Sequence, residues 1–244
     1  MMPVDSSPLT ASIAERLRRV QERVRAACLR AGRDPEEVTV IGVTKTFPVS
    51  VVEAAYRAGL THFGENRVQE LVEKALALPG KLHGGEVTWH LIGHLQRNKA
   101  KRAVAYADFF HALDSLRLAE AIEKRAAQQG RVMPCLVEVN VSGEESKFGV
   151  SPEALYPFLD ALADFEHLEV LGLMTIAAYL PDPEEVRPQF RRLRMLFEGY
   201  VDSENPRVKM KYLSMGMSHD FEVAIEEGAT HVRIGRAIFG ERTG

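Results

Sequence analysis

Residues 38–46 read Val-Thr-Val-Ile-Gly-Val-Thr-Lys-Thr, a short apolar run that ends in polar residues and Lys45. An uninterrupted apolar run is typical of a strand that helices cover on both faces. A longer amphipathic segment follows, in which Ser50 and Glu53 fit a helix capping box and Gly59 ends the helix. The next apolar run begins at Thr61. This stretch therefore predicts one strand-helix unit.

The same succession repeats along the whole chain. Apolar runs that fit strands occupy residues 38–43, 61–64, 88–93, 109–113, 135–140, 168–176, 212–217 and 231–239. Residues 222–231 resemble residues 53–62 in sequence, since each segment fits a helix, a glycine that ends the helix and the start of a strand. Eight such units fit a (β/α)8 TIM barrel better than a doubly wound sheet. We expect a single α/β domain over residues 1–244, with an extra N-terminal helix at about residues 9–31 and the barrel at about residues 38–240.

The composition excludes several classes of protein. The 244 residues are 45% hydrophobic and 27% charged, with a formal net charge of -3, so the basic excess typical of nucleic-acid binding is missing. We find neither a run of roughly 18 apolar residues, as a membrane helix requires, nor a signal-peptide pattern in residues 1–10. Cys28 and Cys135 lie far apart, outside any metal-binding spacing. We expect a cytoplasmic monomer or weak dimer with reduced cysteines and with neither a nucleic-acid nor a membrane partner.

Lys45 is the first candidate for chemistry, because active sites of such barrels lie at the C-terminal ends of the strands. The buried run before Lys45 directs its amine into the barrel mouth. Loss of hydration there lowers the pKa of a lysine and makes its free amine available for a Schiff base. The position alone fits equally a lysine that extends its amine past a strand end into solvent.

The residues after the last two predicted strands fit a phosphate site. Ser218 stands where a helix N-cap is expected, Gly235 permits close approach of the backbone, and Arg233 supplies a fixed planar donor. An ordinary cap and a core arginine would explain each of these alone. A lysine on the first strand that faces such a group on neighbouring strands is more informative, and it points to a phosphorylated aldehyde cofactor.

Further polar residues at strand ends could line the same mouth, namely Glu65, Asn66, His90, His94, Asp114 and Asn140. His90 and His94 have the spacing of metal ligands on one face of a strand. No carboxylate or cysteine completes a recognisable ligand set with them, so we expect no metal.

Several motifs occur together and in order from about residue 38 to residue 240. They are Val43-Thr-Lys-Thr46, Phe63-Gly-Glu-Asn66, Trp89-His-Leu-Ile-Gly93, Leu95-Gln-Arg-Asn-Lys99, Ser146-Lys-Phe-Gly149, Gly172-Leu-Met-Thr-Ile176, Ser214-Met-Gly-Met-Ser218 and Arg233-Ile-Gly-Arg-Ala-Ile-Phe-Gly240. As a set they resemble the YggS/PROSC family of homeostasis proteins that bind pyridoxal 5'-phosphate (PLP).

The resemblance implies a fold-type III PLP barrel related to the N-terminal domain of alanine racemase, with Lys45 as the lysine that forms the Schiff base. It also implies that Arg233 faces the pyridine nitrogen and that Asn66 flanks the cofactor. Ser218, with Met217 beside it, Gly235 and the backbone of Arg236 would hold the phosphate. Many members of the family have a small hydroxyl residue in place of Arg236.

The resemblance also implies the function, a carrier or buffer of PLP that takes part in vitamin B6 and amino-acid homeostasis without robust catalysis. PLP-dependent apo-enzymes would be its recipients. Only Glu241-Arg-Thr-Gly244 follows the last predicted strand, so we expect neither the second domain of alanine racemase nor its acid/base tyrosine. The alternative is a low-activity racemase or amino-acid lyase that uses Lys45 as its sole base.

Overall fold

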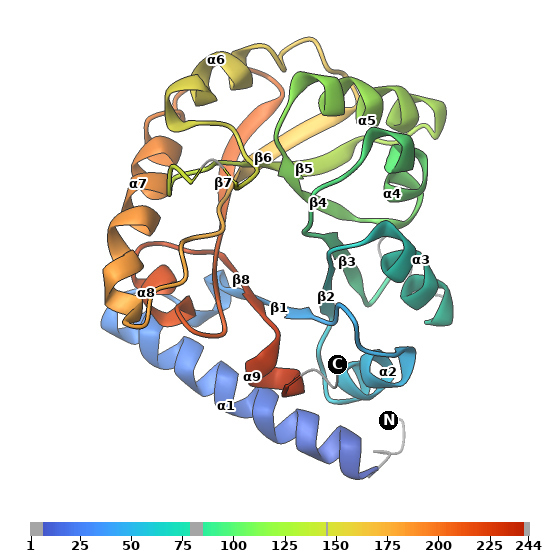
Figure 1. Cartoon of the computed structure of the whole chain (residues 1–244), viewed down its shortest axis with the longest axis vertical. Helices are drawn as coiled ribbons and strands as arrows, with labels where there is room; N and C mark the ends of the chain where they lie inside the picture. The colour runs from blue at the N-terminus through green and yellow to red at the C-terminus, as the bar shows by residue number, and fades with distance from the viewer. Residues whose placement is uncertain (1–6, 79–84, 145, 242–244) are drawn as a thin grey trace.

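Eight parallel strands close into a barrel in chain order, with β8 pairing with β1 (Figure 1). The computed structural model describes residues 7–78, 85–144 and 146–241. The strands are β1 (Thr39–Val43), β2 (His62–Glu65), β3 (Thr88–Leu91), β4 (Phe109–Leu113), β5 (Met133–Glu138), β6 (Leu168–Met174), β7 (Val208–Met217) and β8 (His231–Ile234). The predicted (β/α)8 barrel is therefore confirmed.

Helices surround this barrel and cover the outward-facing apolar residues of its strands. They are α1 (Pro8–Arg30), α2 (Val49–Arg57), α3 (Val68–Ala77), α4 (Ala100–Tyr106), α5 (Leu116–Gln128), α6 (Leu155–Asp160), α7 (Arg187–Glu198), α8 (Phe221–Glu226) and α9 (Arg236–Phe239). Short 3-10 turns precede α4, α6 and α7, and another lies between α1 and β1; they span Arg97–Lys99, Pro152–Ala154, Pro183–Val186 and Pro35–Glu37.

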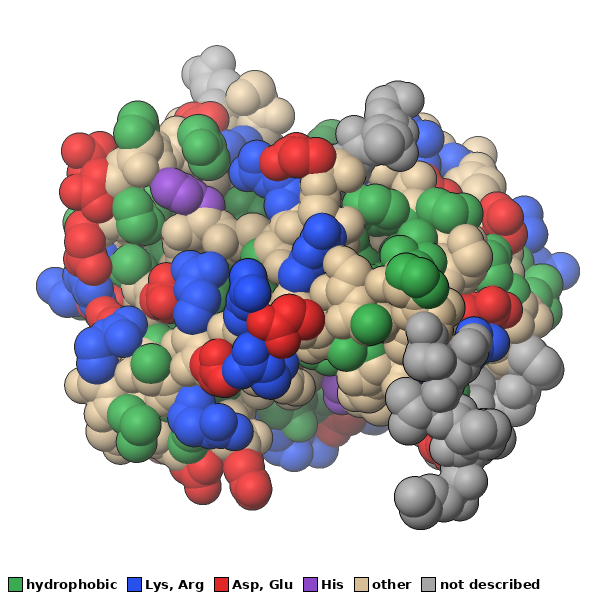
Figure 2. Space-filling model, turned by 90° about the horizontal axis from the view of Figure 1, so that it is seen from below, with side chains coloured by type: hydrophobic (Ala, Val, Ile, Leu, Met, Phe, Trp, Pro, Cys, Tyr) green, Lys and Arg blue, Asp and Glu red, His purple; other side chains and the backbone are tan. Residues whose placement is uncertain are grey.

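The extra N-terminal helix is present as predicted. The Ser7 side chain accepts a hydrogen bond from the Thr10 amide at 3.2 Å and so caps α1. Ile13, Leu17 and Val20 are buried on one face of α1, which packs against α2, α8 and α9. The view from below, the side on which α1 lies, shows basic and acidic side chains interspersed at the surface (Figure 2).

Three local predictions were wrong. The predicted strand at residues 231–239 ends at Ile234, since the apolar residues after Gly235 form the short helix α9. Strand β7 begins at Val208, where alternating exposed lysines interrupt the apolar run and hide the strand. Helix α2 begins at Val49, after Pro48, and no side chain among the described residues caps it, so Ser50 and Glu53 form no capping box.

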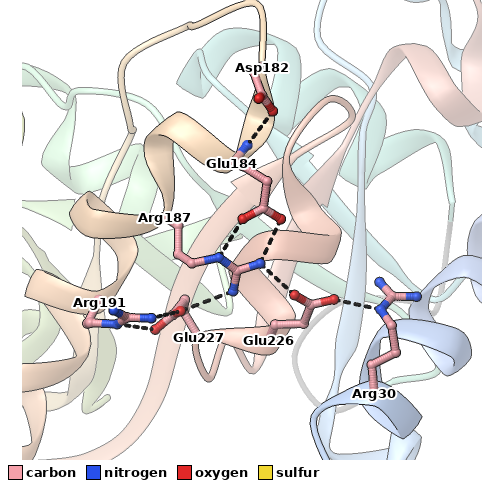
Figure 3. Close-up of polar contacts among 7 residues, drawn as sticks. All are labelled: Arg30, Asp182, Glu184, Arg187, Arg191, Glu226 and Glu227. Atoms are coloured by element: carbon pink, nitrogen blue, oxygen red, sulfur yellow. Dashed lines mark hydrogen bonds and ion pairs between the residues drawn. The ribbon is translucent and has the colours of Figure 1, made fainter.

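A network of ion pairs joins α1, α7 and α8 on the outside of the barrel (Figure 3). Arg187 of α7 pairs with Glu184, Glu226 and Glu227 at 2.7, 2.7 and 3.1 Å, and Glu226 also pairs with Arg30 of α1 at 2.7 Å. These contacts raise the pKa of Arg187, with the hydrogen bond to Glu184 as the largest cause. They hold the C-terminal end of α8 in place, on the side of that helix away from the barrel mouth.

Cys28 and Cys135 are both buried free thiols, as predicted. Among the described residues, no helix combines the length and the apolar character needed to cross a membrane.

Candidate functional site

One cavity of about 800 Å³ opens at the C-terminal ends of the strands. Its volume falls within the range of about 300–1,000 Å³ that is usual for small-molecule sites. The structure brings all seven predicted site residues into its lining, which contains Lys45, Asn66, Met217, Ser218, Arg233, Gly235 and Arg236. They come from the ends of β1, β2, β7 and β8, and β1 is the direct neighbour of both β2 and β8.

The loop that carries Lys45 is fixed on both sides of that residue. Before it, the buried Thr44 donates its hydroxyl to Glu65 at 2.6 Å and accepts a hydrogen bond at its carbonyl from Lys74 at 2.7 Å. After it, the amide of Thr46 donates to Glu70 at 2.6 Å. Thr46 has a φ of 69°, a conformation that β-branched residues rarely adopt and that the surrounding contacts must impose.

A buried ion pair underlies this loop. The amine of Lys74 lies 2.7 Å from Glu65, and both side chains are buried. Burial raises the pKa of Glu65, and the charge of Lys74 opposes that effect. The sequence prediction placed Glu65 among the residues of the mouth, whereas the structure places it beneath the mouth, where it supports Thr44.

The Ser218 hydroxyl receives hydrogen bonds from the amides of Gly235 and Ala237, at 3.2 and 3.3 Å. The prediction that Ser218 caps the following helix was wrong, since Asp220 is the residue before α8. The hydroxyl instead joins the end of β7 to the first turn of α9. A Cβ at Gly235 would meet only Val43, at ordinary distances of 3.6 and 3.8 Å, so protein packing does not require a glycine there. The space that this glycine leaves open belongs to the cavity.

Gly216 shapes the turn that leads to Ser218. Its φ is 92°, and a Cβ on it would lie 2.6 Å from Ala224 and 2.9 Å from Phe221. Only glycine avoids both the strain and the collision with α8. The amide of Met217 then donates to Asp220 at 2.6 Å, which holds the turn closed.

Arg233 is a buried cation in the floor of the cavity. It donates to the Ser214 hydroxyl at 2.6 Å and to the Thr175 carbonyl at 2.8 Å. Burial lowers the pKa of Arg233 to about 10, against the opposing charges of Asp220 and Glu138. The guanidinium therefore stays charged near neutral pH and is fixed by neutral acceptors.

Sequence reasoning missed Glu138, which lines the same cavity from the end of β5. Its side chain is 6% exposed, and burial raises its pKa to about 7, with the charge of Arg233 opposing the rise. The residue lay inside the run predicted as a strand at residues 135–140, and its position beside Arg233 depends on barrel closure. A carboxyl group with a pKa near neutrality is suited to acid/base chemistry.

His94 also lines the cavity, as predicted, and Asp114 orients it at 3.1 Å. The exposed ring of Phe148 stacks on the imidazole with a centroid distance of 4.0 Å. The other predicted mouth residues lie elsewhere: Asn140 lines a smaller adjoining pocket, and His90 is buried inside the barrel. Among the described residues, no three His, Cys, Asp or Glu side chains gather into a metal site.

The sequence of the whole barrel matches a known family. A family model described as "Alanine racemase, N-terminal domain" matches residues 13–243. The chain belongs to this family. A pyridoxal phosphate homeostasis protein of Aquifex aeolicus is 49% identical over 93% of this chain and 97% of its own. The resemblance predicted from the motifs is therefore confirmed.

Solved structures of the family agree with the fold. An unknown protein from Bifidobacterium adolescentis matches with a TM-score of 0.90 and 36% identity, over 96% of this chain and 97% of its own. PipY of Synechococcus elongatus, solved with PLP bound, matches with a TM-score of 0.77 and 35% identity, over 93% of this chain and 100% of its own.

Proposed function

We propose that this protein binds PLP reversibly through Lys45 and serves in PLP homeostasis. The observation that carries the proposal is the shared cavity, in which Lys45 after β1 and the Ser218 turn after β7 lie on either side of β8. Its relatives support the same function, since one is named a pyridoxal phosphate homeostasis protein and another was solved with PLP bound.

The residues of the cavity fit the chemical groups of PLP. The hydroxyl of Ser218 and the open space at Gly235 suit a phosphate, and the exposed Arg236 supplies positive charge to it. The Arg236 guanidinium lies 4.0 Å from Glu241, too far for a strong hold, so it can turn toward an anion. Asn66 would flank the ring from the end of β2, and Met217 would lie beside the phosphate.

Bound PLP supplies an aldehyde that amines attack and a ring that withdraws electrons. Lys45 would bind the aldehyde, and the contacts of Thr44 and Thr46 keep its backbone in place. Arg233 would face the pyridine nitrogen. A permanent positive charge there disfavours protonation of the nitrogen and weakens the ring as an electron sink. This arrangement favours holding the cofactor over driving chemistry with it.

The test is the absorbance spectrum of the purified full-length protein with added PLP. We expect a band in the near-visible range that Lys45→Ala abolishes, and a borohydride-reduced adduct that peptide mass spectrometry places on Lys45. Lys147→Ala is the matched control, because Lys147 is ion-paired with Glu144 outside this cavity. An unchanged band in Lys45→Ala would refute the assignment.

A slow racemase or lyase is the second candidate, and one observation favours it. Glu138 and His94 line the same cavity as Lys45, so acid/base groups besides the lysine are available. Exchange of the α-proton for deuterium in a panel of amino acids would separate the two functions. Robust exchange would contradict a carrier without catalysis. Transfer of PLP to apo-enzymes, a monomeric or weakly dimeric state and a cytoplasmic location remain predictions from the sequence.

A further inference from the structure

A chain of imidazoles crosses the inside of the barrel and ends at Arg233. His62 of β2 lies 3.0 Å from His90 of β3, measured between Nδ1 and Nε2. The Nδ1 of His90 lies 2.9 Å from the Nε2 of His111 in β4. The Nδ1 of His111 in turn lies 3.0 Å from the hydroxyl of Ser214 in β7, which accepts from Arg233 at 2.6 Å.

The direction of these hydrogen bonds follows from counting donors. Arg233 can only donate, so Ser214 accepts from it and has one hydroxyl proton left to give. Within the described residues the acceptor in reach of that proton is Nδ1 of His111. A neutral imidazole that accepts at Nδ1 must donate from Nε2. His111 therefore donates to His90, and His90 donates to His62.

The electrostatics of the barrel favour the same direction. Burial lowers the pKa of His90 and of His111 well below the ordinary value, and it also lowers the pKa of His62, so all three rings are neutral near pH 7. With protons on Nε2, the negative end of each ring dipole points toward the guanidinium of Arg233. The positive end of the chain then lies at His62, where the charge of Asp108 acts on the ring.

The chain also connects two separate spaces. Arg233 lies in the floor of the cavity of about 800 Å³ at the C-terminal ends of the strands. His62 lines a second pocket, of about 450 Å³, formed by α1 and the starts of β1 and β2. The hydrogen bonds thus run from the candidate cofactor site to the opposite end of the barrel.

We propose that Ser214, His111, His90 and His62 form a positioning relay, defined by these four residues, that holds Arg233 charged and oriented toward the ring of the bound cofactor. The proposal rests on the proposed function, because it assigns the relay a role toward PLP. Neutral, aligned acceptors stabilise the cation without placing a carboxylate in direct contact with it, so its charge still acts on the pyridine nitrogen.

The first test is the tautomeric state of the three histidines, read from nitrogen-15 NMR of the full chain with and without PLP. We expect the ring proton on Nε2 in His62, His90 and His111. A proton on Nδ1 of His90 or His111 would overturn the relay. This result does not depend on whether the protein binds PLP.

The second test compares two buried rings. His111→Phe keeps an aromatic ring but removes the hydrogen bonds to Ser214 and His90, and we expect about tenfold weaker PLP binding, which is the size of the contribution of about one hydrogen bond. The nitrogen-15 resonance of labelled PLP should also move, because the Ser214 hydroxyl that accepts from Arg233 loses the acceptor of its own proton. His231→Phe is the matched control, since His231 is buried beside His111 with ring centroids 6.1 Å apart but lies outside the relay. If His111→Phe and His231→Phe weaken PLP binding equally, the loss comes from packing alone and the relay is refuted.

A third variant covers the case in which His111→Phe does not fold. His62→Phe changes the half-buried residue at the far end of the relay and keeps Ser214, His111 and His90 unchanged. We expect the nitrogen resonances of His111 to shift, although the two rings are not in contact through a hydrogen bond. An unmoved His111 would refute the relay. Absence of any PLP spectrum in the wild-type protein would instead refute the proposed function.

Discussion

Glu138→Gln tests the electrostatics of the cavity most directly. Burial raises the pKa of Glu138 from 4.5 to about 7, which means that the folded protein holds this proton more tightly than the unfolded chain does. Stability from this group is complete below about pH 4.5, falls as the pH rises from there to about 7, and is lost at higher pH. A tenfold change in acidity corresponds to about 1.4 kcal/mol, so the loss above about pH 7 amounts to about 3 kcal/mol.

Glutamine resembles the protonated carboxyl and does not ionise. We therefore expect Glu138→Gln to match the wild-type free energy of unfolding at about pH 4 and to exceed it by about 3 kcal/mol at about pH 8.5. Urea denaturation at both pH values measures the difference. Glu120→Gln on the exposed face of α5 is the control and should leave the free energy of unfolding unchanged at both pH values. The reasoning fails if Glu138→Gln has the same effect at both pH values, because the carboxyl would then ionise alike in both states.

Three other substitutions probe the framework of the site, each measured by denaturation. Lys74→Met leaves Glu65 buried without its ion-pair partner and should lower the free energy of unfolding by about 3–5 kcal/mol. Adding Glu65→Gln should restore part of this stability. Arg187→Ala removes three ion pairs at once and should cost about 1–3 kcal/mol, seen as a lower Tm. Gly216→Ala should cost more than Gly143→Ala, since both have positive φ but only Gly216 would collide with α8; equal costs would contradict the steric argument.

The sequence predicted the parts of the site that depend on strand ends. Lys45 follows an apolar run directly, and barrel closure then places it beside the ends of β8 and β2. The segment after Gly235 was predicted as strand because Ala237, Ile238 and Phe239 are apolar, and apolar residues fit a short buried helix equally well. Here the local pattern does not distinguish the two structures.

The relay could not be predicted from local patterns. Its histidines stand at positions of β2, β3 and β4 that would otherwise hold apolar barrel residues, and the bond from His111 to Ser214 crosses the barrel from β4 to β7. No periodicity links residues 103 positions apart in the chain. Glu138 was missed for a related reason, since its pKa depends on burial and on Arg233, which comes from a different strand.

The polar interior bears on whether this barrel holds PLP or reacts with it. A pyridine nitrogen that faces a carboxylate gains a proton and becomes a strong electron sink, whereas one that faces a guanidinium does not. The charge of Arg233 is supported by Ser214 and Thr175 in direct contact, and by Glu138 and Asp220 through their charges. Because Glu138 ionises near pH 7, that second support weakens in acid, while the direct contacts persist. The hydrogen bonds to neutral acceptors therefore keep Arg233 in place over the pH range in which the carboxyl titrates, and with it the restraint on cofactor chemistry.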